Sequence, residues 1–202
     1  MHADPAGVLT GAHSLDGDHA CCEGALAAGC RFVAGYPITP ASSILELMER
    51  YLPRYGGRAL QGANERESIR AALGASAAGA MSMVGTSGPG LSLKVEEIGV
   101  SGATETPLVI VDAMRAGPST GMPAKAEQGD LALVVGGGHG EIPRIVLAPS
   151  TIDECFTLIH EAVRLAEAAA ETVGAVGILG VELFLGPDDA VLINELAPRP
   201  HN

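Results

Sequence analysis

The chain has 202 residues, of which 47% are apolar and 18% charged, which excludes a disordered or fibrous protein and allows one folded core with a small addition. Its formal net charge of −12 argues against nucleic acids and anionic membranes as partners, because both would repel it. The 27 glycines and the aromatic content of 3% are typical of an α/β protein whose helices pack closely on a sheet.

The cysteines argue for a reducing compartment. The four of them, Cys21, Cys22, Cys30 and Cys155, include no C-x-x-C pair, so we expect free thiols rather than a disulfide framework or an iron–sulfur site in this chain. No apolar run reaches the length of a membrane span, and the first ten residues do not resemble a secretory signal. These features predict a cytoplasmic protein.

Alternating apolar patterns predict an α/β fold with a doubly wound, mostly parallel sheet. Residues 1–16 are expected to be a flexible leader. The predicted strands are 31–35, 59–61, 81–85, 107–112 and 143–148. The predicted helices are 18–28, capped by Asp18 and ended by Gly29, then 41–52, one that begins at Glu65, 89–103, 128–135 and 151–169.

Polar residues follow four of these strands, namely Thr39, Glu65, Ser87 and Arg115. Ligands of such sheets bind beyond the carboxyl ends of the strands, so we expect one edge to gather these side chains. The run from Gly85 to Gly90 (GTSGPG) predicts a sharp strand-to-helix turn whose backbone amides face a ligand above Thr86 and Ser87. An ordinary βα corner is the alternative.

The end of the chain has a different pattern. Residues 176–185 and 190–196 predict two strands joined by a turn at 186–189, which is a C-terminal β-hairpin. Glu182 and Glu195 on these strands carry carboxylates of the kind that bind Mg²⁺. The glycine-rich run 136–140 lacks the lysine of a P-loop and does not predict a phosphate site.

Four motifs in order carry a family resemblance: GYPITP (35–40), the small-residue helix that begins at Glu65, TSGPG (86–90) and RAGPSTG (115–121). Over residues 18–168 the chain resembles the α subunit of 2-oxoacid:ferredoxin oxidoreductases, especially the 2-oxoglutarate type. The resemblance implies that residues 17–169 form the pyrimidine-binding domain of a thiamine-diphosphate enzyme.

The resemblance also implies roles for individual residues. Glu65 would bind the aminopyrimidine ring and drive its tautomerism, and Thr86, Ser87 and Gly88 would contact the cofactor. Thr39 and Arg115 would bind the carboxylate of the 2-oxoacid. Taken alone, Glu65 is better explained as a surface glutamate stabilised by a helix dipole, and a salt bridge at a strand end is the alternative for Arg115.

The implied enzyme needs a second polypeptide. The family's G-D-G motif for Mg²⁺ and diphosphate is absent from the sequence, and in relatives it lies on a β subunit together with the iron–sulfur cluster. The expected reaction is oxidative decarboxylation of a 2-oxoacid with CoA, with electrons passing to ferredoxin through that partner.

Residues 171–202 resemble instead the end of an ATP-grasp domain, that of 5-(carboxyamino)imidazole ribonucleotide synthase in purine biosynthesis. This resemblance sets a domain boundary near residue 170 and implies that Glu182 and Glu195 hold Mg-ATP. Two alternatives to the oxidoreductase follow from it: an ATP-grasp ligase fragment, and an inactive fusion of two gene pieces.

Overall fold

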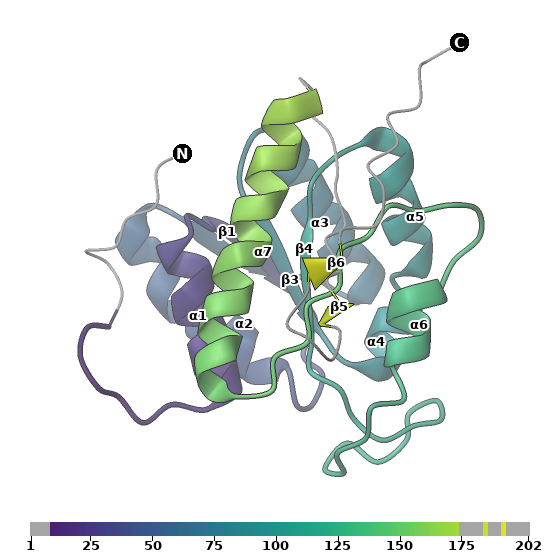
Figure 1. Ribbon diagram of the computed structural model, residues 1–202, viewed down its shortest axis with the longest axis horizontal. Coiled ribbons are helices and arrows are strands. Elements are labelled where there is room, and N and C mark those ends of the chain that lie inside the picture. The colour runs from purple at the N-terminus through teal and green to yellow at the C-terminus, as the bar shows by residue number, and fades with distance from the viewer. Residues whose placement is uncertain (1–8, 174–183, 186–190, 193–202) are drawn as a thin grey trace.

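A parallel sheet of four strands forms the centre of the molecule (Figure 1). The computed structural model describes residues 9–173, 184–185 and 191–192. The strands are β1 (Phe32–Gly35), β2 (Arg58–Gln61), β3 (Ser82–Thr86) and β4 (Val109–Asp112), in the order β2-β1-β3-β4. Every pairing between neighbours is parallel. The prediction of a doubly wound, parallel α/β sheet is therefore confirmed.

Seven α-helices and one short 3-10 helix surround the sheet in the described part of the chain. They are α1 (Gly17–Ala27), α2 (Ser42–Tyr51), η2 (Leu52–Tyr55), α3 (Glu65–Ala77), α4 (Gly88–Ser92), α5 (Val95–Thr104), α6 (Leu131–Gly136) and α7 (Ile152–Val173). None of them is both long and apolar enough to cross a membrane.

The two faces of the sheet are covered by different helices. Successive strand residues point to opposite faces, so Val33 and Met83 join the core formed with α1, α2 and α7. Ala34 and Val84 join a second core with α3, which also contains Ile98 of α5. Figure 1 shows α7 running alongside α1. These layers leave the carboxyl edge of the sheet to the loops that follow each strand.

The start of α1 differs from the prediction by two residues. Asp16, and not Asp18, is the N-cap, since its Oδ1 accepts a hydrogen bond of 2.9 Å from the His19 amide. Asp18 lies in the first turn, and its carboxylate instead accepts from the hydroxyl of Ser43. Gly29, at a φ of 100°, follows the helix as predicted.

The predicted helix 89–103 is two helices, because the chain bends at Leu93 and Lys94. The Lys94 amide donates to the carbonyl of Leu91, three residues earlier, and α5 begins at the next residue. The Lys94 side chain is fully buried. The break was not predicted because the apolar pattern is continuous across it. Its effect is to place Lys94 inside the protein.

The predicted strand 143–148 is wrong. Val146 is buried as expected of a strand, but the segment has no ladder partner and lies beyond β4 as irregular structure. Arg144 donates to the carbonyl oxygens of Val134, at 2.7 Å, and Gly137 at the end of α6. Prolines at both ends remove backbone donors that a ladder would use, so the run packs against α6 rather than extending the sheet.

Near the C-terminus, β5 (Phe184–Leu185) pairs antiparallel with β6 (Val191–Leu192), in agreement with the predicted hairpin. The turn at 186–189 lies outside the described residues. Glu182 and Glu195, the predicted metal ligands, also lie outside them. In the described ranges, no three His, Cys, Asp or Glu side chains are grouped as metal ligands.

Candidate functional site

The carboxyl edge of the sheet gathers the residues predicted to form a site. Thr39 follows β1, Glu65 follows β2, Thr86 ends β3 and Arg115 follows β4. The Arg115 Nη1 donates a hydrogen bond of 2.8 Å to the Thr39 carbonyl oxygen. A Cβ built on Gly90 would lie 2.5 Å from Thr86 Oγ1 and 3.4 Å from Glu65 Cγ. Four segments that are separate in sequence thus meet at one edge.

Glu65 is the first residue of α3 and is half-buried. Asn64 caps the helix by accepting from the Glu67 amide at 2.9 Å, so the backbone at Glu65 is fixed by its neighbours. The aliphatic part of Glu65 lies against the small-residue turn at Gly90 rather than projecting freely from the helix. This placement favours a role at the sheet edge over that of a surface glutamate.

The turn after β3 is closely packed around Gly90 and contains a polar atom without a partner. A side chain at Gly90 would overlap Thr86, and would also lie 3.3 Å from Ile38 Cδ1. The hydroxyl oxygen of Ser87 is buried and has no hydrogen-bond partner in the described part of the chain. A buried hydroxyl without a partner, in a turn where only glycine fits, is a candidate for binding a polar ligand.

The Gly88 amide is already occupied. It donates a hydrogen bond of 3.0 Å to Asp130 Oδ2, from the residue that precedes α6. Of the three residues predicted to contact a cofactor here, Thr86 and Ser87 present polar side-chain atoms at the site. Gly88 instead joins the turn to α6, and its φ of 25° suits a residue without a side chain.

Arg115 is buried, with 6% of its surface exposed. Its Nη1 and Nη2 donate to the carbonyl oxygens of Thr39 and Thr120, the latter at 2.7 Å, while Nε has no partner. No carboxylate among the described residues pairs with it, so the salt bridge considered as an alternative is not found there. A buried guanidinium with unused donors is suited to binding an anion.

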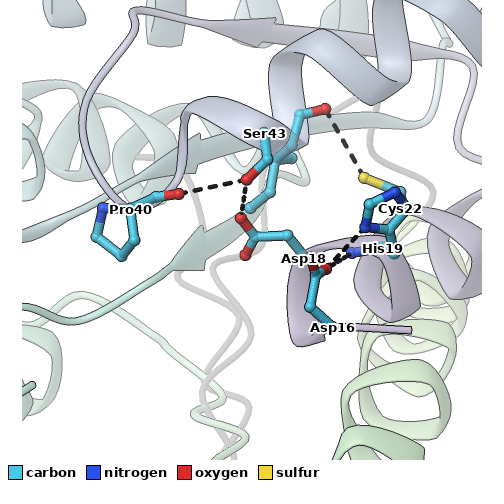
Figure 2. A network of polar contacts seen from close by, with 7 residues as sticks. Asp16, Asp18, His19, Cys22, Pro40 and Ser43 are labelled. Atoms are coloured by element: carbon cyan, nitrogen blue, oxygen red, sulfur yellow. Dashed lines mark hydrogen bonds and ion pairs between the residues drawn. The ribbon is translucent and has the colours of Figure 1, made fainter. Parts of the chain in front are cut away.

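A polar network supports the loop that carries Thr39, as Figure 2 shows. The Ser43 hydroxyl at the start of α2 is shared between the Asp18 carboxylate and the carbonyl oxygen of Pro40, at 3.4 Å from the latter. Burial raises the pKa of Asp18, against the effect of the Ser43 hydrogen bond. Helix α1 therefore helps to fix the loop beside the site.

Two ionisable residues at this edge of the sheet were not predicted from the sequence. Burial lowers the pKa of Lys94 to about 8. Burial, and then the neighbouring Asp130 carboxylate, raise the pKa of Asp112 to about 8. Two signals were available: a lone lysine in a run of small and apolar residues, and an aspartate that directly ends a buried strand.

Comparison with known proteins agrees with this geometry. Residues 23–185 match the family described as pyruvate flavodoxin/ferredoxin oxidoreductase, thiamine diphosphate-binding. The chain is 49% identical over 153 residues to the 2-oxoglutarate synthase subunit KorA of Methanocaldococcus jannaschii, covering 76% of this chain and 42% of that protein. It is 47% identical over 154 residues to the ketoisovalerate oxidoreductase subunit VorB of Methanothermobacter thermautotrophicus, covering 76% and 44%.

A solved structure is similar as well. The 2-oxoglutarate:ferredoxin oxidoreductase from Magnetococcus marinus, with 2-oxoglutarate, coenzyme A and succinyl-CoA bound, superimposes with a TM-score of 0.76 at 40% identity. The match covers 83% of this chain and 28% of that one.

None of these proteins is described as an ATP-grasp enzyme, and the family match extends into segment 171–202, so the ATP-grasp interpretation is not supported. The chain spans less than half the length of the relatives it matches. The match over residues 23–185 and the assembled sheet edge show that this chain belongs to the pyruvate flavodoxin/ferredoxin oxidoreductase family of thiamine diphosphate-binding domains.

Proposed function

We propose that this chain supplies the pyrimidine-binding half of the thiamine diphosphate site in a 2-oxoacid:ferredoxin oxidoreductase, with 2-oxoglutarate as the substrate. The observation that carries the proposal is the meeting of Glu65 with Thr86 at Gly90, where a half-buried glutamate packs against a buried turn that has no room for a side chain. Family membership gives this arrangement its cofactor.

The residues present can hold the aminopyrimidine end of the cofactor. Glu65 would hydrogen-bond a ring nitrogen and exchange a proton with it, as a general acid and base. The partnerless Ser87 hydroxyl would supply a further hydrogen bond, and Gly90 would allow the ring to approach the backbone. Thiamine diphosphate, when bound, supplies the nucleophilic carbon for attack on a keto group.

Arg115 and Thr39 would bind the carboxylate of the 2-oxoacid. The guanidinium is held by two backbone carbonyls and keeps further N–H groups for an anion, and the exposed Thr39 side chain adds a hydroxyl. Charge-assisted hydrogen bonds from arginine are well suited to a carboxylate. The similarity to both 2-oxoglutarate and ketoisovalerate enzymes makes the choice of 2-oxoacid a point to test.

Partners complete the proposed enzyme. A β subunit would hold Mg²⁺, the diphosphate and an iron–sulfur cluster, and would pass electrons to ferredoxin in the cytoplasm, with CoA accepting the acyl group. The relatives named above are themselves described as subunits, which supports an assembly of this kind.

The test is to produce this chain with its partner subunit and measure dye or ferredoxin reduction with CoA and either 2-oxoglutarate or 2-oxoisovalerate. Glu65→Ala is expected to lower the rate by about a hundredfold or more, because a general acid–base group is removed. Glu96→Ala, an exposed glutamate on α5, serves as the control. Full activity of the Glu65→Ala enzyme would overturn the proposal.

A further inference from the structure

Lys94 is a buried cation at the proposed site. It lies at the bend between α4 and α5, and its side chain is fully buried. Its Nζ donates to Thr86 Oγ1 at 3.1 Å and approaches the Gly90 carbonyl oxygen at 3.5 Å. Burying an ammonium group is unfavourable unless opposite charge and hydrogen bonds compensate, so the surroundings of Lys94 must supply both.

Three carboxylates on three different elements stabilise the ammonium. They are Glu65 on α3, Asp112 at the end of β4, and Glu97 on α5. Glu97 is already bound, because its Oε1 accepts from Arg66 at 3.2 Å and from Arg70 at 2.8 Å.

Asp112 also contributes little charge at neutral pH, because burial and the nearby Asp130 raise its pKa to about 8. Glu65 is therefore the carboxylate left to balance Lys94.

The same lysine fixes the direction of the Thr86 hydroxyl. Since Thr86 Oγ1 accepts from the ammonium, its own hydrogen points elsewhere and remains available as a donor. Thr86 and Glu65 both lie close to Gly90. One buried cation thus contacts the first of these side chains and balances the charge of the second.

We propose that Lys94 is a positioning residue of this site: its ammonium fixes the Thr86 hydroxyl and balances the charge of Glu65, so that both keep their places where the aminopyrimidine binds. This inference rests on the proposed function. Lys94 itself does not touch the substrate; it acts through the two side chains that it holds.

The first test needs no cofactor. The chain has two lysines, Lys94 and the exposed Lys125, so ¹³Cε-lysine labelling gives two NMR signals, and Lys125 provides an internal reference. The Lys94 signal is expected to titrate near pH 8. Glu65→Gln should lower this midpoint by about one unit, because a stabilising charge is lost, whereas Glu96→Gln should leave it unchanged.

An unchanged Lys94 titration in Glu65→Gln, or an equal shift in Glu96→Gln, would overturn the inference. This measurement remains informative if substitution of Lys94 itself prevents folding.

The second test measures function in the assembled enzyme. Lys94→Met is expected to weaken thiamine diphosphate binding about tenfold and to leave the KM for 2-oxoglutarate unchanged, because Arg115 and Thr39 are untouched. Thr86→Val should share this loss, whereas Thr86→Ser, which keeps the hydroxyl, should not. Wild-type cofactor affinity in Lys94→Met would overturn the inference.

The two proposals fail in different ways. If Glu65→Ala retains full activity, the proposed function is wrong, whatever Lys94 does. If Glu65→Ala is inactive while Lys94→Met binds the cofactor normally, only the inference about Lys94 is wrong.

Discussion

The two ends of the sheet differ in whether their buried polar groups have hydrogen-bond partners within the protein. At the amino end, residues 31–32, 55–58 and Ala80 line a hollow of about 460 Å³. Arg31 there donates to the carbonyl oxygens of Leu26, at 3.1 Å, and Cys30, at 2.8 Å, and its guanidinium lies 5.7 Å from the centre of the Tyr55 ring. The guanidinium of Arg31 thus has its partners within the protein itself.

At the carboxyl end, buried polar atoms remain without partners in the described part of the chain. They are Ser87 Oγ and Arg115 Nε. Unsatisfied buried polar groups are unfavourable for stability, so these atoms support the proposed ligand site at this end. Among the described residues that line the hollow at the amino end, no buried polar side-chain atom is left without a partner.

Gly90→Ala is expected to have the largest effect, and it tests the carboxyl end. The added Cβ would lie 2.5 Å from Thr86 Oγ1 and 3.4 Å from Glu65 Cγ, so one of these side chains must move. We expect thiamine diphosphate to bind about tenfold to a hundredfold more weakly, which calorimetry on the assembled enzyme would measure.

Gly74→Ala is the matched control for this change, because Gly74 lies in α3 with nothing within 4 Å of its added Cβ. It should leave cofactor binding unchanged and stabilise the helix slightly. Normal cofactor affinity in Gly90→Ala would mean that the pyrimidine ring binds elsewhere. It would contradict the proposal that the carboxyl end of the sheet, unlike the amino end, binds the ligand.

Gly57→Ala applies the same change to the amino end. Its Cβ would lie 2.5 Å from the Arg31 carbonyl oxygen and 2.8 Å from Leu52 Cδ2, so the loop before β2 must shift. We expect a loss of about 1–3 kcal/mol in the free energy of unfolding, measured by denaturant titration. The folded fraction of the Gly57→Ala protein should bind the cofactor with wild-type affinity. A loss of affinity would contradict the view that the amino end of the sheet serves only the structure.

Much of the fold was predictable because it depends on local patterns. The four strands of the sheet and the turn after β3 follow from apolar runs and glycine positions, which are local features of the sequence. Residues 143–148 show the limit of this reasoning. Their composition suits a strand, but whether a strand forms depends on a partner, and Arg144 binds α6 instead.

The site was predictable where one residue follows one strand and carries its own chemistry, as Thr39, Glu65 and Arg115 do. Their roles as ligand contacts stay predictions, but their meeting at one edge follows from the parallel order of the strands. Lys94 was not predictable in this way. Its burial arises from a helix break and from carboxylates on other elements, which only the tertiary structure brings together.

Asp112→Asn sharpens the contrast through the pH dependence of stability. Because the pKa of Asp112 is raised from 3.8 to about 8, the folded protein binds one more proton than the unfolded chain between these values. Stability from this group is fully present below pH 4 and is lost as the pH rises through 8. Asparagine cannot ionise, so the variant should lose less stability than the wild type between pH 5 and 8.

Denaturant unfolding at pH 5, 6, 7 and 8 would measure this difference, with Asp153→Asn on the exposed start of α7 as the control. Lys94, whose pKa is lowered to about 8, adds its own pH dependence only above that value, where the folded protein loses its proton before the unfolded chain does. The difference between the wild-type and Asp112→Asn curves from pH 5 to 8 therefore reports Asp112. Parallel curves for wild type and Asp112→Asn would mean that this carboxyl group is ionised in the folded protein, and Glu65 would then not be the main counter-charge of Lys94.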